Sequence, residues 1–289
     1  MISDLVLHPR TRSVSEQFIA KPSHSLLIVG PAGAGKKTLA INLAATVLGQ
    51  TPAKLTSNPY FLHIFPDGSS ITIETIRQTQ AFVRLKTTGT QTWRRAIIIE
   101  DAHLLTVEAQ NAFLKLLEEP PADTLIILTA TSQTDLLPTI TSRAPKLDVK
   151  PVAQADLTAH FEGQAEPAEI TKAYHMSGGQ VGLMGALLDS ENNQVLLGYV
   201  AAAKELLQAK PFERLVFIDQ YIKQKDSVES LLWALLAVSK AALFQAGQHD
   251  KTALVKRWRA SIDAILQAQD SLSAHPLPKL LLTDLSLVL

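Results

Sequence analysis

The chain has 289 residues and no cysteine, which excludes disulfide bonds and zinc sites built on cysteine. It also lacks an excess of either charge, because 27 lysine and arginine residues balance 27 aspartate and glutamate residues. Proteins that bind nucleic acid by charge alone carry a basic excess. The sequence therefore argues against a stand-alone DNA binder and leaves open contact with nucleic acid within a larger assembly.

Long hydrophobic runs are scarce as well. The most apolar run, residues 231–238, is shorter than the roughly 20 residues of a membrane-spanning helix. The first residues, Met1-Ile2-Ser3-Asp4, carry an acid and lack the apolar core of a secretory signal. We expect a cytoplasmic protein with no membrane partner. Hydrophobic residues make up 46% of the chain, which is enough for a large core.

The most informative stretch that is present is a glycine-rich loop. An apolar run at residues 26–29 is followed by Gly30, Gly33, Gly35 and Lys36, which fit the P-loop pattern G-x-x-x-x-G-K between a strand and a helix. Glycines allow backbone N–H groups to turn around a phosphate, and the helix N-terminus adds partial positive charge. The stretch predicts a phosphate site; the alternative is a glycine-rich turn that holds no ligand.

One position of this loop departs from the pattern. The residue after the P-loop lysine is usually Ser or Thr, whose hydroxyl holds Mg²⁺. Here it is Lys37, and a threonine follows only at Thr38. We expect a loop that holds phosphate but has lost its usual metal position. ATP binding stays open, Mg²⁺ would enter only with ATP, and no zinc is expected.

The hydrophobic pattern predicts an α/β domain followed by helices. Short apolar runs alternate with helical patterns in the first half, which indicates a parallel sheet with flanking helices. In such sheets ligands bind beyond the C-terminal ends of the strands, and Glu100, Asp101 and Thr131 fall at such ends. The expected strands are residues 25–29, 61–65, 95–99, 125–129 and 147–149, and the expected helices are 11–19, 36–48, 73–85, 106–117, 195–207, 211–223, 228–244, 252–269 and 278–289, with two or three short helices between 150 and 190.

Three segments resemble one known family. Residues 98–121 read IIEDAHLLTVEAQNAFLKLLEEPP, residues 136–143 read LLPTITSR, and residues 71–77 read ITIETIR. Together they resemble the AAA+ clamp-loader subunits of bacterial DNA polymerase III, and most closely the delta-prime type. The resemblance is strong over residues 24–145 and weaker to the C-terminus. It implies a P-loop AAA+ domain at residues 1–149, a helical lid at 150–191 and a helical collar at 192–289.

The resemblance also implies roles for single residues. Phosphate contacts fall to the loop glycines and Lys36, and Thr131 takes the sensor position beside the γ-phosphate. Glu100 and Asp101 stand at the Walker B end in the reverse of the active order, in which Asp precedes Glu. Arg143 takes the place of the arginine finger that reaches a neighbour's ATP; a salt bridge is the alternative for this residue.

The departures from the family pattern are as informative as the matches. Lys37, the reversed acidic pair, Leu183 where the lid usually carries an arginine, and the missing four-cysteine zinc module all differ from an active member. The leading hypothesis is a delta-prime-like subunit with little or no hydrolysis of its own. Its implied partners are gamma/tau-like and delta-like subunits, with the sliding clamp and primer-template DNA reached through the complex. The alternatives are an active gamma/tau-type ATPase and an unrelated AAA+ remodelling ATPase.

Overall fold

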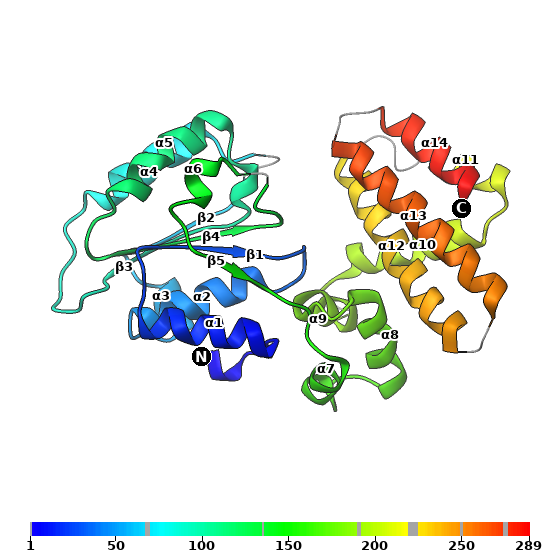
Figure 1. Ribbon diagram of the computed structural model, residues 1–289, viewed down its shortest axis with the longest axis horizontal. Coiled ribbons are helices and arrows are strands. Elements are labelled where there is room, and N and C mark those ends of the chain that lie inside the picture. Colours follow the sequence, from blue (N-terminus) through cyan, green and yellow to red (C-terminus); the bar gives the residue numbers. More distant parts are fainter. Residues whose placement is uncertain are drawn as a thin grey trace. The chain divides into compact units, whose positions relative to one another are not determined.

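The computed structural model describes residues 2–66, 70–134, 136–189, 192–218, 225–248, 251–273 and 277–289. The chain forms two compact units, Met1–Ala153 and Gln154–Leu289 (Figure 1). Each is described by itself. The predicted collar and the predicted lid from residue 154 onward lie in the second unit, whereas residues 150–153 of the lid lie in the first. The boundary between lid and collar at 191/192 adjoins residues 190 and 191, which lie outside the described residues, so that boundary stays a prediction.

The first unit contains a parallel sheet of five strands in the order β2-β3-β4-β1-β5. This confirms the predicted sheet, and β1 has the predicted bounds. β3 and β4 are buried along their whole length, which explains why their sequences are almost wholly apolar. The strands are β1 (Ser25–Val29), β2 (Phe61–Ile64), β3 (Arg95–Ile99), β4 (Thr124–Ala130) and β5 (Lys146–Asp148).

Helices cover both faces of this sheet (Figure 1). Alternate strand residues face opposite sides: Leu26 and Ile28 join the core beneath α2, whereas Leu27 joins the core beneath α4 and α5. The helices of the first face are α1 (Pro9–Ala20), α2 (Lys36–Val47) and α3 (Pro52–Thr56), those of the second are α4 (Ile73–Val83), α5 (Val107–Glu118) and α6 (Pro138–Thr141), and two 3-10 turns are η1 (Ile2–Asp4) and η2 (Ala102–Leu104).

The second unit is helical in its described residues. Its core centres on α12, whose Leu231, Leu232 and Leu235 are buried and which packs against α8, α10 and α13. The helices are α7 (Gln154–Phe161), α8 (Pro167–Ser177), α9 (Val181–Leu188), α10 (Gln194–Gln208), α11 (Pro211–Ile218), α12 (Lys225–Gln248), α13 (Thr252–Ser273) and α14 (Pro278–Val288).

The structure extends the apolar run 231–238 into a longer helix. Within α12 the segment Ser227–Gln248 reaches a mean hydropathy of 1.5, so by length and composition it meets the test for a membrane-spanning helix. The shortness of the run 231–238 therefore does not by itself argue against a membrane-spanning helix. The buried residues of α12 belong to the core of the helical unit, and a core helix of a water-soluble protein passes the same test.

One predicted segment differs from the structure, and two others lie partly outside the described residues. The stretch 50–59, expected to be a loop, contains the short helix α3. The hydroxyl of Thr51 accepts the Lys54 N–H at the start of the helix, and the helix buries its own Leu55 in the core. The helix expected at 211–223 is described only to Ile218, and the turn expected at 66–70 includes residues 67–69; residues 219–223 and 67–69 lie outside the described residues.

Candidate functional site

The loop between β1 and α2 has the backbone of a phosphate cradle. Gly33 and Gly35 have φ angles of 77° and 82°, values that glycine adopts at little cost. Gly30 is required for a different reason, because a Cβ there would lie 3.1 Å from the Cβ of Val149. Gly35 begins α2 without a side-chain cap, which leaves N–H groups at the helix start for a ligand.

Lys36 lies inside this loop. Its Nζ donates to the carbonyl oxygens of Gly30 at 2.9 Å and Pro31 at 3.1 Å, and the residue is only 8% exposed. Burial lowers the pKa of Lys36, and the charges of Asp101 and Glu100 oppose that effect. The buried ammonium and the two acidic residues therefore belong to one electrostatic site at the C-terminal ends of β1 and β3.

Lys37 reaches the acidic end of β3. Its Nζ lies 3.2 Å from Oε2 of Glu100, and Nε2 of His63 lies 3.0 Å from the same oxygen. Burial lowers the pKa of His63 in spite of the neighbouring Glu100 charge, which favours neutral imidazole. His63 ends up in the site because β2 pairs in parallel with β3. Sequence reasoning missed it, since nothing in the β2 pattern separates this histidine from its neighbours.

Asp101 adopts a left-handed backbone conformation with φ of 49°, the only positive φ among the described residues other than glycine. Its N–H donates to Oγ1 of Thr129 on β4 at 3.0 Å. Strained positions of this kind persist where surrounding structure holds them, often at ligand sites. The predicted residues Thr38 and Thr131 are both exposed, at the start of α2 and directly after β4.

Arg143 follows α6, and its side chain contacts Glu118 and Thr139 of the same unit. Its Nη2 lies 2.7 Å from Oε1 of Glu118, and its Nη1 donates to the Thr139 carbonyl at 2.9 Å. The salt bridge considered for this residue is thus present. Its side chain is 36% exposed, so the guanidinium remains accessible. Leu183 lies buried on α9, in the second unit.

Comparisons with known proteins agree with this geometry. A sequence model described as "DNA polymerase III, delta subunit" matches residues 14–153. The DNA polymerase III subunit delta' of Pseudomonas aeruginosa is 30% identical over 216 residues, which cover 66% of this chain and 65% of that protein. Over the matched residues this chain is similar to delta' subunits of DNA polymerase III. The corresponding Bacillus subtilis subunit delta' is 32% identical over 161 residues, which cover 50% of this chain and 48% of that protein.

A solved structure has the same fold over nearly the whole chain. The DNA polymerase III gamma subunit-related protein of Thermotoga maritima superposes with a TM-score of 0.60 at 19% identity, covering 96% of this chain and 98% of that one. At this identity the likeness shows the fold alone: a parallel five-stranded sheet with flanking helices, followed by a helical region. Matched segments span about two thirds and about half the length of the two curated relatives.

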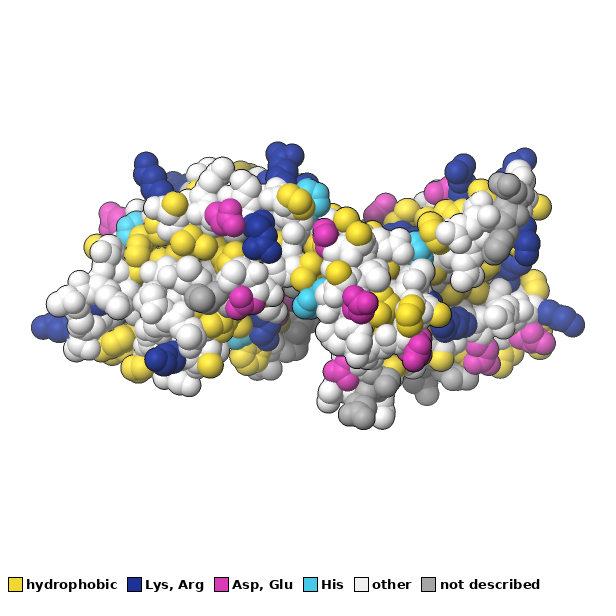
Figure 2. All heavy atoms as spheres, turned by 90° about the horizontal axis from the view of Figure 1, so that it is seen from below, with side chains coloured by type: hydrophobic (Ala, Val, Ile, Leu, Met, Phe, Trp, Pro, Cys, Tyr) yellow, Lys and Arg dark blue, Asp and Glu magenta, His cyan; other side chains and the backbone are white. Residues whose placement is uncertain are grey.

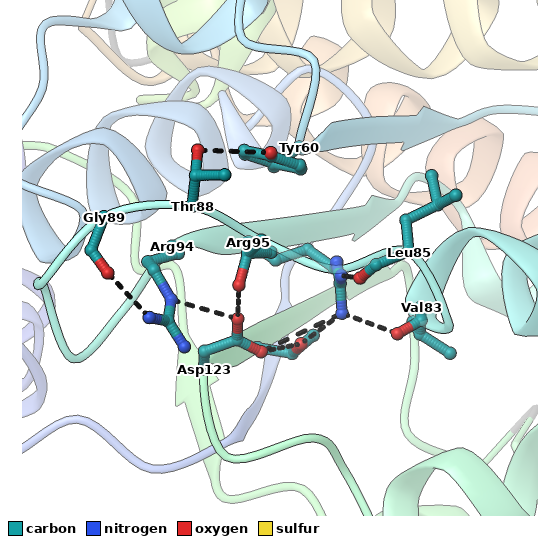
Figure 3. Close-up of polar contacts among 10 residues, drawn as sticks. Tyr60, Val83, Leu85, Thr88, Gly89, Arg94, Arg95 and Asp123 are labelled. Atoms are coloured by element: carbon teal, nitrogen blue, oxygen red, sulfur yellow. Dashed lines mark hydrogen bonds and ion pairs between the residues drawn. The ribbon is translucent and has the colours of Figure 1, made fainter.

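A second polar cluster lies at the opposite, N-terminal ends of the strands (Figure 3). Arg95 begins β3 and is 1% exposed, and its guanidinium donates to the carbonyl oxygens of Val83 and Leu85 and pairs with Asp123. Asp123 also accepts from Thr87 and lies 3.2 Å from Nε of Arg94. This cluster ties the end of α4 to the starts of β3 and β4.

Neither cluster is arranged as a metal site within the described residues. Within the described residues, no group of three or more histidine and acidic side chains is arranged to hold a metal ion. On the face drawn in Figure 2, basic and acidic side chains are scattered among polar and hydrophobic ones, consistent with the balanced charge of the chain. The loop between β1 and α2, with Glu100 and Asp101 beside it, is the candidate site.

Proposed function

We propose that this chain is a delta-prime-like subunit of a DNA polymerase III clamp loader. In that role it helps an ATP-driven hetero-pentamer to load the sliding clamp on primed DNA, in the cytoplasm, and hydrolyses little or no ATP itself. The observation that carries the proposal is the Lys37–Glu100 ion pair of 3.2 Å, which sets two charged side chains against each other where an active P-loop ATPase needs a hydroxyl and a metal-supporting acid. The similarity to delta' subunits supports it.

The residues of the loop fit phosphate better than they fit Mg²⁺. Gly30, Gly33, Gly35 and Lys36 would hold a phosphate group of ATP, and ATP would supply the transferable γ-phosphoryl group. The acidic side chain that would face the metal, Glu100, is already paired with Lys37. This chain's residues therefore bind and orient phosphate at most, and we derive no hydrolytic step at this site.

Arg143 is the residue that we assign to the neighbour's ATP. A guanidinium that stabilises transition-state charge must reach beyond its own subunit, and Arg143 is partly exposed on the short helix–strand connection after α6. Its bond to the Thr139 carbonyl and its ion pair with Glu118 orient it without burying it. The role is that of an arginine finger in trans.

The helical unit supplies the assembly surfaces under this proposal, as a lid at 150–191 and a collar at 192–289. α14 exposes Leu280, Leu287 and Val288 at 59%, 63% and 62%, and a groove lies between α13 and α14. Contiguous exposed apolar side chains favour protein contacts. The proposed partners are gamma/tau-like and delta-like subunits, with the clamp and primer-template DNA contacted through the complex.

The proposal is tested by assembly first and by turnover second. The chain should co-purify with clamp-loader subunits from its host and sediment alone as a monomer; a homo-hexamer would indicate an AAA+ remodelling ATPase instead. Measurable ATPase activity of the isolated chain would indicate a gamma/tau-type subunit. Arg143→Ala should lower the ATPase rate of the reconstituted complex about 10²-fold or more without lowering assembly. Unchanged turnover would contradict the arginine-finger role.

A further inference from the structure

We propose that the Lys37 ammonium takes the place of the divalent cation in this P-loop, so that the loop binds a diphosphate or triphosphate group without a metal. The observation is geometric. The residue at the position of the Mg²⁺-holding hydroxyl sends its Nζ to within 3.2 Å of Glu100 Oε2, at the strand end where an acid would otherwise support the metal. The Lys37 ammonium, a cation that belongs to the protein itself, thus lies beside the Glu100 carboxylate.

The charges around the loop favour this substitution. The ammonium groups of Lys36 and Lys37 and the start of α2 face Glu100 and Asp101, and Glu100 already accepts from Lys37 and contacts His63. A divalent cation entering here would be repelled by two ammonium groups and would compete for a carboxylate that is already paired. A polyphosphate meets the opposite balance, because it brings the negative charge that the two lysines and the helix N-terminus attract.

Both lysines have the freedom that binding requires. The Lys36 ammonium carries three N–H donors, two of which reach the carbonyls of Gly30 and Pro31, so one remains for a phosphate oxygen. The Lys37 side chain is 53% exposed, so it can turn from Glu100 toward a phosphate while His63 stays on Glu100. Nothing in this cluster reads a base or a sugar, and the ligand class is therefore the polyphosphate group itself.

The inference deepens the proposed function at the same site, and it rests on that function only in treating the loop as a phosphate cradle. The test is isothermal titration calorimetry of the full chain with inorganic pyrophosphate and with ATP, each in EDTA and in excess Mg²⁺. We expect binding of both ligands in EDTA and binding about tenfold weaker in Mg²⁺, because the metal neutralises charge that Lys37 would otherwise meet. Binding of ATP alone would show that the base is read and would overturn the assignment of the ligand class.

Variants at position 37 give the inference a second test. Lys37→Thr should lower the affinity in EDTA about tenfold and make added Mg²⁺ strengthen binding, whereas Lys37→Arg should keep metal-free binding. Lys54→Thr, at an exposed lysine of α3, is the matched control and should change nothing. Circular dichroism establishes that each variant is folded.

The wild-type comparison decides even if Lys37→Thr does not fold. Absence of binding in EDTA, or wild-type binding that needs Mg²⁺, would overturn the inference. Neither result would touch the clamp-loader role, which depends on assembly with partner subunits and on Arg143. Conversely, metal-free binding by a chain that assembles with no partner would support the inference and contradict the proposed function.

Discussion

The guanidinium of Arg143 is held by the carboxylate of Glu118, with 2.7 Å between Nη2 and Oε1. The two residues come from different segments, since Glu118 ends α5 and Arg143 follows α6. Both side chains are substantially exposed, at 36% and 48%, and exposed ion pairs contribute only about 0–1 kcal/mol. On the proposal that Arg143 acts on a neighbour's ATP, a phosphate of that neighbour would displace Glu118 at small cost, so Glu118 is an exchangeable partner of Arg143.

Glu118→Gln should strengthen the engagement of Arg143 with a neighbour's ATP. Removing the competing carboxylate is expected to lower the apparent KM for ATP of the reconstituted complex by up to about fivefold, the factor that corresponds to an exposed pair. Steady-state ATPase measurements at several ATP concentrations check this. Glu119→Gln, at the adjacent exposed glutamate, is the matched control. A raised KM would instead mean that Glu118 holds the arginine in its working orientation.

Asp123→Ala should destabilise the first unit strongly. It leaves the buried guanidinium of Arg95 without its acid, and breaking one half of a buried pair costs about 3–5 kcal/mol. Urea denaturation monitored by circular dichroism measures the change. Asp148→Asn breaks exposed pairs with Lys146 and Lys150 and should cost about 1 kcal/mol or less. Equal effects of the two variants would show that the Arg95 cluster contributes no special stability.

Asp123 also makes the free energy of unfolding depend on pH in the acid range. Burial by itself would raise the pKa of Asp123, but the Thr87 hydrogen bond and the Arg95 charge outweigh it and the pKa lies below the model-compound value of 3.8. A group with a lowered folded pKa stabilises the fold above its unfolded pKa, and that stability is lost as the pH falls from 3.8 through the folded value. The Asp123→Ala variant should lack this part of the acid denaturation curve.

His175 gives a second, milder pH dependence, in the helical unit. Its ring on α8 stacks on Phe244 of α12 at 3.6 Å between centroids, its Nε2 is buried with no hydrogen-bond partner among the described residues, and burial lowers its pKa below 6.5. The unfolded chain then binds the proton more readily, so the free energy of unfolding falls as the pH drops below 6.5 toward the folded pKa.

His175→Phe should keep the ring stack and remove this dependence. The measurement is the Tm at about pH 7.5, where histidine is neutral in the folded and the unfolded chain, and at about pH 5, where histidine in the unfolded chain is protonated. The wild type should lose more Tm on acidification than the variant. His160→Phe, at an exposed histidine of α7, should behave as the wild type. Burial also lowers the pKa of His63, so His63 adds a pH dependence of stability that both variants retain.

The sheet was predictable from the sequence because its strands are covered on both faces. Buried strands such as β3 and β4 read as continuous apolar runs, and their bounds follow from where those runs end. The small helix α3 was not predictable, since its single proline and its polar residues resemble a loop and only the burial of Leu55 gives it a reason to form. Propensity over five residues is too weak a signal for such a helix.

The sequence names the loop residues and the acidic pair of the candidate site, but it names neither His63 nor the pairings between side chains. The P-loop, Glu100 and Asp101 follow from motif spacing and from the rule that ligands gather at strand ends. The Lys37–Glu100 pair depends on the strand order β2-β3-β4-β1. Lys37 follows β1, Glu100 follows β3, and β4 lies between these two strands. The sequence does not specify this order. The contacts of His63 with Glu100 and of Arg143 with Glu118 arise from the same long-range geometry.

The buried cluster of Arg95 and Asp123 lies at the starts of β3 and β4, whereas the P-loop and Glu100 lie at the opposite, C-terminal edge of the same sheet. Rigidity and ligand chemistry are therefore assigned to different ends of the strands. Exposed side chains such as Lys37 can be replaced without disturbing what holds the sheet together. Such a division makes the fold tolerant of change at the loop: the side chain at position 37 can alter the charge at the ligand-binding end of the strands while the cluster that anchors the sheet stays as it is.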